Sequence, residues 1–367
     1  MPGPNASRYP NSLQVRIALD ATPLVLTSGG LQRYVAELSL ALAREFPEDH
    51  YSLLSDQPFE LPDSHPTNLT SPNTPAHGKR WWLTGLRRAL QAERAQLFHG
   101  TNFEVPWLPP VPSILTIHDL SPWKDPAWHP GPNRVRSRTP WLIRLRRAER
   151  ILTVSEAVRR EVINHFGVAP SLVRAVPLAA ATLFRPVPVM QPPPAPYFLY
   201  VGTLEPRKNI GALMEAWAAT RAETGADLLL VGRRRPDLVP IPPRAGLRLV
   251  GEVPDADLPG LYSNALAFVY PTHYEGFGLP VLEAMGCGCP VITSTDPAVT
   301  EVSGGAAIHA QAGHALAEAL IALAAKPELR EHFRAAGLKR AAQFSWQRTA
   351  RETRALYAEL TVKGSRA

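Results

Sequence analysis

Short apolar runs alternate with segments of helical periodicity along this chain, and the alternation occurs twice. One series begins with the apolar run at 15–20 and a helical pattern at 31–45, and the other begins with the apolar run at 197–201. Between the two series, residues 185–196 read RPVPVMQPPPAP, and prolines at this density exclude a helix or a central strand. Strands that alternate with helices form parallel sheets with helices on both faces. The sequence therefore predicts two doubly wound α/β domains joined by a proline-rich linker.

The predicted domain boundaries follow from the same pattern. The first domain is expected over residues 1–186, the linker over 187–196 and the second domain over 197–346, while a C-terminal helix over about 347–367 is a candidate to complete the first domain. Further strands are expected at 96–99, 113–117, 151–154, 173–176, 227–231, 247–250, 266–269 and 290–293. Further helices are expected at 81–93, 135–149, 155–166, 209–223, 256–264, 279–285 and 330–360.

Composition narrows the class of protein. The chain has 367 residues, 45% of them hydrophobic and 19% charged, which is typical of a globular protein of two domains. Its net charge of +7 favours an anionic partner, which leaves open a nucleotide diphosphate, a phospholipid surface or a nucleic acid. The first twelve residues lack the apolar core of a signal peptide, and no apolar run approaches the roughly 20 residues of a membrane span. We therefore expect a cytoplasmic protein, at most peripheral on the inner face of the cell membrane.

The only two cysteines, Cys287 and Cys289, are separated by one glycine. This spacing is too tight for an unstrained disulfide, and two cysteines are too few for a structural zinc site. Both are expected in a buried turn of small residues, in a reducing compartment.

One loop of the second series has the composition of a phosphate-binding site. In parallel sheets, ligands bind beyond the carboxyl ends of the strands, and residues 270–278, YPTHYEGFG, fall at such an end. Gly276 and Gly278 allow backbone amides to approach a ligand closely, and the helix that follows offers unpaired N–H groups. Glu275 and Glu283 are spaced to reach different parts of one ligand.

The segment from Glu275 onwards, EGFGLPVLEAMGCGCPVITS, resembles the hallmark segment of family 4 glycosyltransferases, whose E-x7-E motif is matched by Glu275 and Glu283. The resemblance implies the GT-B fold, in which two Rossmann-like domains face a central cleft, retention of anomeric configuration, and no need for a metal. It implies that Glu283 binds the donor ribose and Glu275 the transferred sugar. The backbone of Gly276, Phe277, Gly278 and Leu279 would hold the diphosphate. The alternative is a tight glycine turn followed by a solvated Glu283.

A second loop, residues 200–210 with the sequence YVGTLEPRKNI, follows the first strand of the second domain. Arg207 and Lys208 are expected at the mouth of a helix, where their charge and their number of hydrogen-bond donors suit a pyrophosphate. By resemblance, Lys208 and the loop at Gly202 bind the donor diphosphate. Many family members carry an arginine directly after the glycine, where this chain has Thr203, so Arg207 is the candidate second cation. The alternative is a pair of exposed basic residues.

Two loops of the first domain also resemble the family. Gly29 and Gly30 match the glycine loop that faces the donor phosphates. His118 ends an apolar run, and the resemblance places it near the transferred hexose on the acceptor side, whereas a histidine fixed by hydrogen bonds in a tight turn is the alternative. We expect Ser155 to be a helix N-cap. The sequence Asp255-Ala-Asp257 is interpreted as acidic residues at a helix N-terminus rather than as a metal site.

These observations predict a hexosyltransferase with Glu275, His118 and Lys208 as candidate catalytic residues. The donor is expected to be a GDP- or UDP-sugar, with no cofactor and no metal, and the acceptor a glycan or a lipid-linked saccharide of cell-surface polysaccharide synthesis, in which the sugar moved is mannose or of glucose type. A non-hydrolysing nucleotide-sugar epimerase and an inactive sugar-nucleotide-binding protein are the alternatives.

Two stretches combine cations with bulky apolar residues: 81–88, with two tryptophans and two arginines, and 134–150, RVRSRTPWLIRLRRAER. On helices, these residues suit an anionic membrane interface, and an arginine-rich solvated surface is an equal alternative. Nucleic acid is not expected as a partner, because no recognised motif accompanies the charge.

Overall fold

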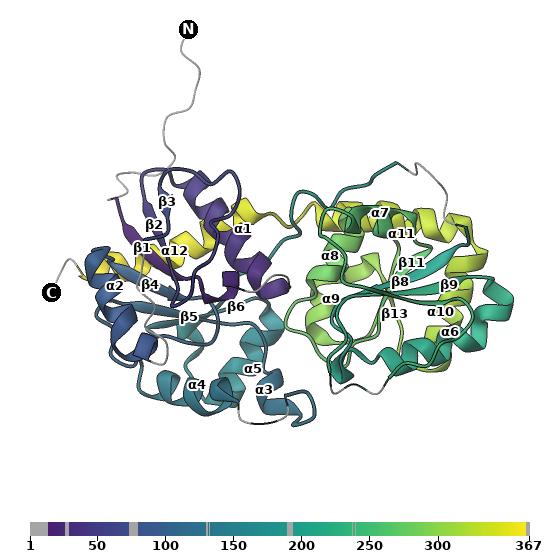
Figure 1. The fold of residues 1–367 in the computed structure, drawn as a ribbon, viewed down its shortest axis with the longest axis horizontal. Coiled ribbons are helices and arrows are strands. Elements are labelled where there is room, and N and C mark those ends of the chain that lie inside the picture. Colours follow the sequence, from purple (N-terminus) through teal and green to yellow (C-terminus); the bar gives the residue numbers. More distant parts are fainter. Residues whose placement is uncertain are drawn as a thin grey trace, which may run out of the picture. The chain divides into compact units, whose positions relative to one another are not determined.

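The computed structural model describes residues 14–25, 29–72, 80–129, 131, 133–188, 194–236, 238 and 240–364. The chain forms two compact units (Figure 1). The first unit takes residues 1–115, 145–149 and 350–367, and the second takes 116–144 and 150–349. Residues 187–196, the predicted linker, fall within the span of the second unit, and 189–193 are outside the described residues. The domain boundaries stay predictions.

Two parallel sheets confirm the predicted α/β class. The first has the strand order β3-β2-β1-β4-β5-β6-β7 and the second has the order β10-β9-β8-β11-β12-β13. The strands of the first sheet are β1 Arg16–Asp20, β2 His50–Leu54, β3 Leu69–Thr70, β4 Leu97–Gly100, β5 Ser113–Ile117, β6 Arg150–Thr153 and β7 Val173–Ala175. Those of the second are β8 Tyr197–Val201, β9 Asp227–Val231, β10 Leu247–Gly251, β11 Ala267–Tyr270, β12 Val291–Thr293 and β13 Ile308–His309.

Helices connect the strands and cover both sheets. They are α1 Gly30–Glu45, α2 Leu86–Ala92, α3 Ser121–Lys124, α4 Arg134–Arg144, α5 Glu156–Phe166, α6 Ile210–Thr224, α7 Leu258–Asn264, α8 Leu279–Gly286, α9 Pro297–Ser303, α10 His314–Ala325, α11 Pro327–Ala341 and α12 Trp346–Gly364. In the second unit, α6 packs against α10, while α8 packs against α7, α9 and α11, so the sheet has a helical layer on each face (Figure 1). Of the helices described, none is both long and apolar enough to span a bilayer.

Several predicted helices differ in extent from those observed. The helix expected at 135–149 ends at Arg144, and Arg146 has a left-handed φ of 51°, which an α-helix does not accommodate. The helix expected at 81–93 begins as one π-helical turn, Trp81–Gly85, before α2. The helical tail expected at 330–360 is two helices, α11 and α12. The strands β2, β3 and β13 and the helices α3, α9 and α10 have no counterpart in the sequence prediction.

The strand order of the second sheet determines where a ligand can bind. β8 and β11 are hydrogen-bonded neighbours, although two strands and two helices separate them in the sequence. The chain leaves β8 towards one edge of the sheet through α6, and it leaves β11 towards the other edge through α8. Loops that diverge in this way open a crevice at the carboxyl ends of their strands. The loops after β8 and β11 are the two that sequence analysis selected.

The last helix returns to the first unit. In α12, Tyr357 hydrogen-bonds the Nδ1 atom of buried His99 at 2.7 Å. Arg354 pairs with Asp49, whose side chain is fully buried, and Arg351 pairs with Glu45 at 2.7 Å. Figure 1 draws α12, in yellow, beside β1 and β4. The first unit is therefore completed by the end of the chain.

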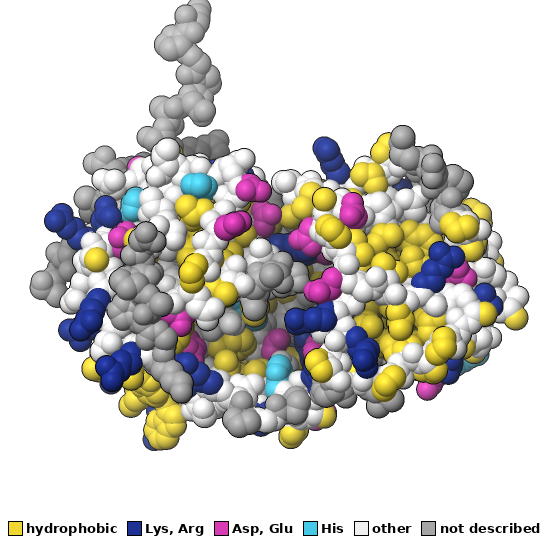
Figure 2. All heavy atoms as spheres, in the orientation of Figure 1, with side chains coloured by type: hydrophobic (Ala, Val, Ile, Leu, Met, Phe, Trp, Pro, Cys, Tyr) yellow, Lys and Arg dark blue, Asp and Glu magenta, His cyan; other side chains and the backbone are white. Residues whose placement is uncertain are grey.

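Basic side chains are distributed rather than gathered on the surface in view. Figure 2 shows Lys and Arg side chains interspersed with Asp and Glu side chains among the described residues of this face. A single-sign surface of the kind that tracks a nucleic-acid backbone is not seen on the part of the face that the structure describes.

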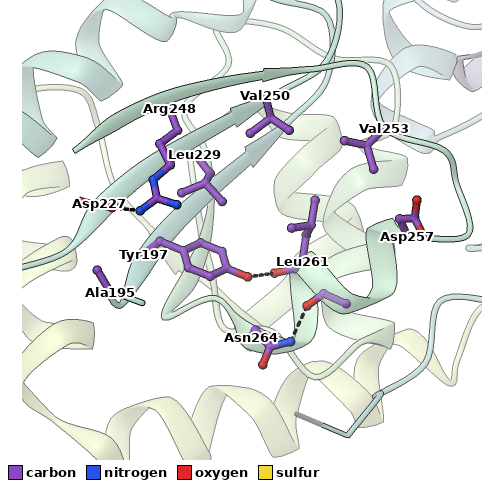
Figure 3. Close-up of a pocket in the computed structure, with 11 residues that line it drawn as sticks. Ala195, Tyr197, Asp227, Leu229, Arg248, Val250, Val253, Asp257, Leu261 and Asn264 are labelled. Atoms are coloured by element: carbon purple, nitrogen blue, oxygen red, sulfur yellow. Dashed lines mark hydrogen bonds and ion pairs between the residues drawn. The ribbon is translucent and has the colours of Figure 1, made fainter. Parts of the chain in front are cut away.

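A cavity of about 420 Å³ lies at the amino ends of the strands of the second sheet, between β8–β10 and α7 (Figure 3). Tyr197, at the start of β8, donates a hydrogen bond to the carbonyl oxygen of Leu261 at 2.8 Å. Arg248 donates to Asp227 at 2.8 Å. The cavity is therefore at the opposite end of β8 from the loop that holds Arg207 and Lys208.

Candidate functional site

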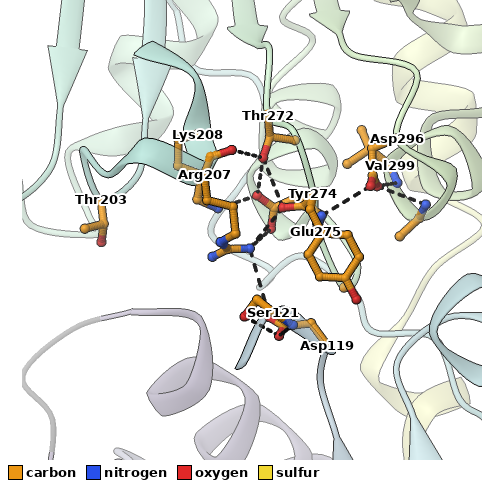
Figure 4. Close-up of polar contacts among 12 residues, drawn as sticks. Asp119, Ser121, Thr203, Arg207, Lys208, Thr272, Tyr274, Glu275, Asp296 and Val299 are labelled. Atoms are coloured by element: carbon orange, nitrogen blue, oxygen red, sulfur yellow. Dashed lines mark hydrogen bonds and ion pairs between the residues drawn. The ribbon is translucent and has the colours of Figure 1, made fainter. Parts of the chain in front are cut away.

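The loop after β8 presents two cations through a short 3-10 turn. This turn is Pro206–Lys208, and Asn209 follows it with a left-handed φ of 54° before α6 begins at Ile210. Arg207 and Lys208 were predicted at the mouth of a helix, and this placement is confirmed, since they directly precede α6. The turn directs both side chains at the loop after β11, as Figure 4 shows.

Glu275 and Lys208 form a buried ion pair. Their side chains are each 9% exposed, and the Lys208 ammonium donates to Oε1 of Glu275. Tyr270, the last residue of β11, accepts a hydrogen bond from Lys208 Nζ at 2.7 Å. Because the cation is buried against a carboxylate, the alternative of an exposed, unengaged basic residue is wrong for Lys208.

Arg207 lies at the centre of a second set of contacts. Its guanidinium donates to Oε1 of Glu205 at 2.9 Å through Nη2, and to the carbonyl oxygen of Tyr274 at 3.0 Å through Nη1. Nη1 is also 3.4 Å from Oε2 of Glu275 and 4.0 Å from Oδ2 of Asp119. Its side chain is 15% exposed, so Arg207 is also engaged rather than free on the surface. Figure 4 shows the guanidinium between Glu275 and Asp119.

Neighbouring charges and burial shift the pKa of Glu275 in opposite directions. Burial raises the pKa of Glu275, but the Lys208 ammonium and the Arg207 guanidinium outweigh burial and hold that pKa below its usual value. Burial, and after it repulsion from Arg207, lowers the pKa of Lys208. The site therefore keeps Glu275 ionised and places two cationic side chains against one carboxylate. Arg207 also pairs with Glu205, so the cluster has no excess of positive charge, but its lysine and arginine are hydrogen-bond donors that suit an anionic ligand such as a diphosphate.

The two glycines of the loop after β11 are each favoured for a different structural reason. Gly278 has a φ of 101°, in the left-handed region, and is the N-cap of α8. Gly276 is packed so closely that a Cβ there would lie 1.8 Å from the carbonyl oxygen of His118. Its own carbonyl oxygen accepts a hydrogen bond from Ser155 Oγ at 2.7 Å. Glycine is therefore favoured at 278 by the backbone conformation and at 276 by the lack of space for a Cβ.

Sequence analysis missed three polar residues around Glu275. Tyr270 donates to Oε1 of Glu275 at 3.1 Å, and Thr272 donates to the same oxygen at 2.9 Å. Asp296, from the loop after β12, accepts from the backbone N–H of Glu275 at 3.3 Å and caps α9. A signal was available, because all three are polar residues that lie at the end of a buried strand or within three residues after it.

Tyr274, next to Glu275, is held on every side within the second unit. Its ring stacks on Trp128 with centroids 5.8 Å apart, and the Lys124 ammonium lies 4.3 Å from its centroid. Its hydroxyl donates to Glu161 at 2.6 Å and accepts from the N–H of Leu120 at 2.8 Å. These contacts fix the backbone that carries Glu275.

Glu283 is placed differently from Glu275. It lies in α8, is 1% exposed, and its Oε2 accepts a hydrogen bond from Tyr262 at 3.3 Å. The alternative of a solvated helix residue is therefore wrong. Its expected role at the donor ribose stays a prediction, as do the roles of Phe277, which packs edge-on against Phe344, and of Leu279, the first residue of α8.

The remaining predicted site residues are found at strand ends. Gly202 follows β8 with a φ of 145°, in the region that favours glycine. His118 follows β5, is half-buried, and brings its carbonyl oxygen against Gly276. Gly29 has a φ of 118° and Gly30 begins α1, both in the first unit. The roles predicted for these four residues at the donor stay predictions.

The structure tests the predictions made for other residues. Ser155 is an N-cap, as predicted, and accepts from the N–H of Val158 at 3.1 Å. Asp257 occupies the N-cap position of α7, at a helix N-terminus as predicted, and its side chain makes no capping hydrogen bond there. Trp81 is 1% exposed, so it cannot contribute to a membrane-facing surface. Cys287 and Cys289 are buried free thiols, as predicted.

Metal ligands are a separate question. Within the described ranges, no group of three or more His, Cys, Asp or Glu side chains is placed to hold a metal ion.

Known glycosyltransferases resemble this chain in sequence and in fold. A model of Glycosyltransferase Family 4 matches residues 28–181, and a model of Glycosyl transferases group 1 matches residues 195–326. The O-antigen chain mannosyltransferase B of Escherichia coli is 34% identical, over 92% of this chain and 98% of its own. Sucrose-phosphate synthase from Thermosynechococcus elongatus has a similar fold, with a TM-score of 0.73 at 22% identity, over 95% of this chain and 100% of that one. Anabaena HepE in complex with UDP-glucose also gives a TM-score of 0.73, at 15% identity and the same coverage.

The structural likenesses and the two parallel sheets confirm the GT-B fold predicted from the sequence. The family models and the near full-length relative extend the likeness from fold to family. The chain belongs to the family 4 glycosyltransferases.

Proposed function

We propose that this glycosyltransferase moves a hexose from a nucleoside-diphosphate sugar to a glycan or a lipid-linked saccharide in cell-surface polysaccharide synthesis. The observation that carries the proposal is the buried cluster of Lys208, Arg207 and Glu275 at the switch point of the second sheet. The lysine and the arginine suit a diphosphate, and the carboxylate of Glu275 suits the hydroxyl groups of a sugar. The 34% identity to an O-antigen mannosyltransferase supports the polysaccharide context.

Mannose is the first choice of sugar, and GDP-mannose the first choice of donor. The support is the name of the E. coli relative, which aligns over nearly its whole length. A UDP-sugar is the second choice, because HepE, of similar fold, was solved with UDP-glucose. Glucose-type transfer is therefore the competing specificity within the same reaction class.

The proposed chemistry is mainly electrostatic. Lys208, Arg207 and the amides at the N-terminus of α8 stabilise the charge that develops on the departing diphosphate, so no metal ion is needed. Glu275 orients the transferred sugar, Glu283 binds the ribose, and His118 lies on the acceptor side. The acceptor hydroxyl attacks from the face that the diphosphate leaves, its proton passes to the leaving phosphate, and the anomeric configuration is retained.

We further propose that the chain rests on the inner face of the cell membrane when its acceptor is lipid-linked. Trp141 in α4 is 55% exposed and shares its helix face with Arg144, while Leu145 is 46% exposed. In the other basic stretch, Leu83 is 61% exposed. Apolar side chains beside arginines suit an anionic lipid interface. Sedimentation with vesicles that contain anionic lipid tests this, and equal sedimentation with neutral vesicles would contradict it.

A donor panel tests the proposed reaction. The purified protein is incubated with GDP-mannose, GDP-fucose, UDP-glucose and UDP-galactose, with and without a saccharide acceptor and with EDTA present. We expect nucleotide release that requires the acceptor, persists in EDTA and is fastest with GDP-mannose. An isomerised donor without acceptor would indicate an epimerase instead, and binding without turnover would indicate an inactive binding protein.

Substitutions test the assignment of the site. Lys208→Ala and Glu283→Ala are each expected to abolish most turnover, because each removes a charge expected to hold the donor, and each should leave the fold intact by circular dichroism. Lys339→Ala, which removes an exposed lysine of α11, is the matched control and should keep full activity. Full activity in either site variant would contradict the assignment.

A further inference from the structure

Glu275 is surrounded by two kinds of hydrogen-bond donor. Lys208 and Arg207 are cationic, whereas Tyr270 and Thr272 offer neutral hydroxyl groups. Oε1 of Glu275 accepts from Lys208, Tyr270 and Thr272, and Oε2 faces Arg207 (Figure 4). The carboxylate is thus satisfied twice over, once by charge and once by hydroxyl groups.

The protons of the two hydroxyls can be assigned from the contacts. Tyr270 accepts from Lys208 Nζ at 2.7 Å, so its single proton is free to point at Oε1 of Glu275, 3.1 Å away. Burial raises the pKa of Tyr270 well above its usual value, so that proton is retained. Thr272 has three acceptors in reach, and Glu275 is the nearest, at 2.9 Å, and the charged one. Both hydroxyls therefore donate to the carboxylate.

Neither hydroxyl can follow a cation that moves away. Tyr270 is 1% exposed, and its ring stacks on Tyr200 at 6.1 Å and on Phe268 at 5.5 Å between centroids. Thr272 is 2% exposed. Lys208, by contrast, carries its ammonium on a long side chain with several rotatable bonds. The hydroxyls are fixed donors and the ammonium is a movable one.

A diphosphate ligand would compete with Glu275 for the same cations. Lys208 and Arg207 both face Glu275. A buried carboxylate that lost both cations would be destabilised by its removal from water unless other hydrogen-bond donors remained. We propose that Tyr270 and Thr272 are positioning residues that keep Glu275 satisfied and in place while Lys208 and Arg207 turn to the donor diphosphate. The inference rests on the proposed function, since it assumes that this site takes a nucleoside diphosphate.

Loss of a hydroxyl should therefore weaken diphosphate binding without any change in the cations. With fewer donors of its own, Glu275 retains Lys208 more strongly, and the ligand must overcome that attraction. A hydrogen bond to a charged group corresponds to about tenfold in affinity. A nucleoside has no phosphate group to bind Lys208, so the affinity of each variant for a nucleoside should equal that of wild type.

The experiment is calorimetric titration of the full chain with GDP, UDP, guanosine and uridine. Tyr270→Phe and Thr272→Val are each expected to raise the Kd of the better-bound nucleoside diphosphate about tenfold and to leave nucleoside affinity within about twofold. Tyr197→Phe is the control, since it removes the hydroxyl of another buried tyrosine of the same sheet, which donates to the carbonyl oxygen of Leu261 far from Glu275 (Figure 3). It should leave every Kd unchanged.

The Glu275→Gln variant distinguishes the proposed role of Tyr270 from a purely structural one. Without the carboxylate, Lys208 and Arg207 are released, so we expect this variant to bind the diphosphate more tightly than wild type. In the same background, Tyr270→Phe should have no further effect on the diphosphate Kd. The coupling between the two positions is then the measured quantity.

The outcomes separate the two proposals. Unchanged diphosphate affinity in both Tyr270→Phe and Thr272→Val would overturn this inference and leave the proposed function standing. The same holds if Tyr270→Phe is equally harmful with and without Glu275, or if Tyr197→Phe matches it. A wild-type chain that binds neither GDP nor UDP would overturn the proposed function and this inference with it.

Discussion

Asp20 shows how far a single residue in this fold departs from its solution behaviour. It ends β1, is 2% exposed, and accepts hydrogen bonds from the backbone N–H and the hydroxyl of Thr22 at 3.0 and 2.5 Å. Burial raises its pKa to about 7, against the opposing effect of the Thr22 hydrogen bonds, and Glu104 and Asp56 raise it further. An acid that binds its proton more tightly in the folded chain makes stability depend on pH in a defined direction.

We predict that the free energy of unfolding of wild type falls as the pH rises from about 4 to about 7, because over this range the folded chain must give up a proton that the unfolded chain has already lost. Asp20→Asn keeps an acceptor for Thr22 and has no proton to lose. Its stability relative to wild type should therefore increase across the same range, by at most about 4 kcal/mol, and stay level above pH 7.

Urea unfolding at pH 4, 5.5, 7 and 8 measures this difference. Asp63→Asn, at an exposed position, is the control for the loss of one negative charge. If the two variants show the same pH dependence relative to wild type, the buried proton on Asp20 is not what sets it.

Among the elements, the loop that joins β11 to α8 is the most restricted by its packing. Gly276 has no room for a side chain, whereas Gly260, in the middle of α7, would place a Cβ where no atom lies within 4 Å. The two glycines are thus a natural pair for comparison, one fixed by close approach and the other free to change.

We predict that Gly276→Ala destabilises the protein by about 1–3 kcal/mol, since the added Cβ must displace the His118 backbone. It should also lower donor turnover, because the displaced loop carries Glu275. Gly260→Ala should be neutral or stabilise by up to about 1 kcal/mol, since alanine favours a helix more than glycine does. Urea midpoints and turnover of both variants provide the measurement, and equal midpoints would mean that the loop can relax without cost.

Much of this loop could be predicted from the sequence, and the reason is local. Gly276 and Gly278 indicate close approach and a left-handed φ, and Glu275 stands at a strand end, all within nine consecutive residues. Tyr270 and Thr272 were quoted in the same segment, but their role depends on Lys208, which is 62 residues from Tyr270 along the chain. Contacts of that range are set by the strand order, and the local pattern does not contain them.

For the helices too, the local sequence pattern predicts the element but not its ends or its long-range contacts. The pattern at 135–149 predicts a helix, and it cannot show the left-handed backbone at Arg146 that accompanies its early end. The pattern at 330–360 predicts helical structure and does not show the break between α11 and α12. The attachment of α12 to Asp49 and His99 depends on residues that lie about 260 to 300 positions earlier.

At the scale of the whole molecule, α12 holds the first unit through ion pairs of very different burial. Asp49 is fully buried and also accepts from the N–H of Val15 at 2.9 Å, so its charge depends on Arg354. The pair of Arg351 with Glu45 is on the surface, where the arginine side chain is 57% exposed.

We predict that Arg354→Ala destabilises the protein by about 3 kcal/mol, because it leaves a buried carboxylate without its cation. Arg351→Ala, on the same helix, should cost less than about 1 kcal/mol, because water screens an exposed pair. Urea unfolding that follows tryptophan fluorescence compares the two variants. Equal losses would show that the buried pair contributes no more than the surface pair.

The return of α12 to the first unit also has a consequence for how the protein is made. β1 and β2 leave the ribosome long before Arg354, the residue that neutralises Asp49, because Arg354 is 305 residues further along the chain. Synthesis of the first unit thus begins before that of the second unit and is completed after it. A nascent chain that stalls, or a message that ends early, yields a polypeptide with a bare acid in an unfinished core, which quality-control proteases would remove.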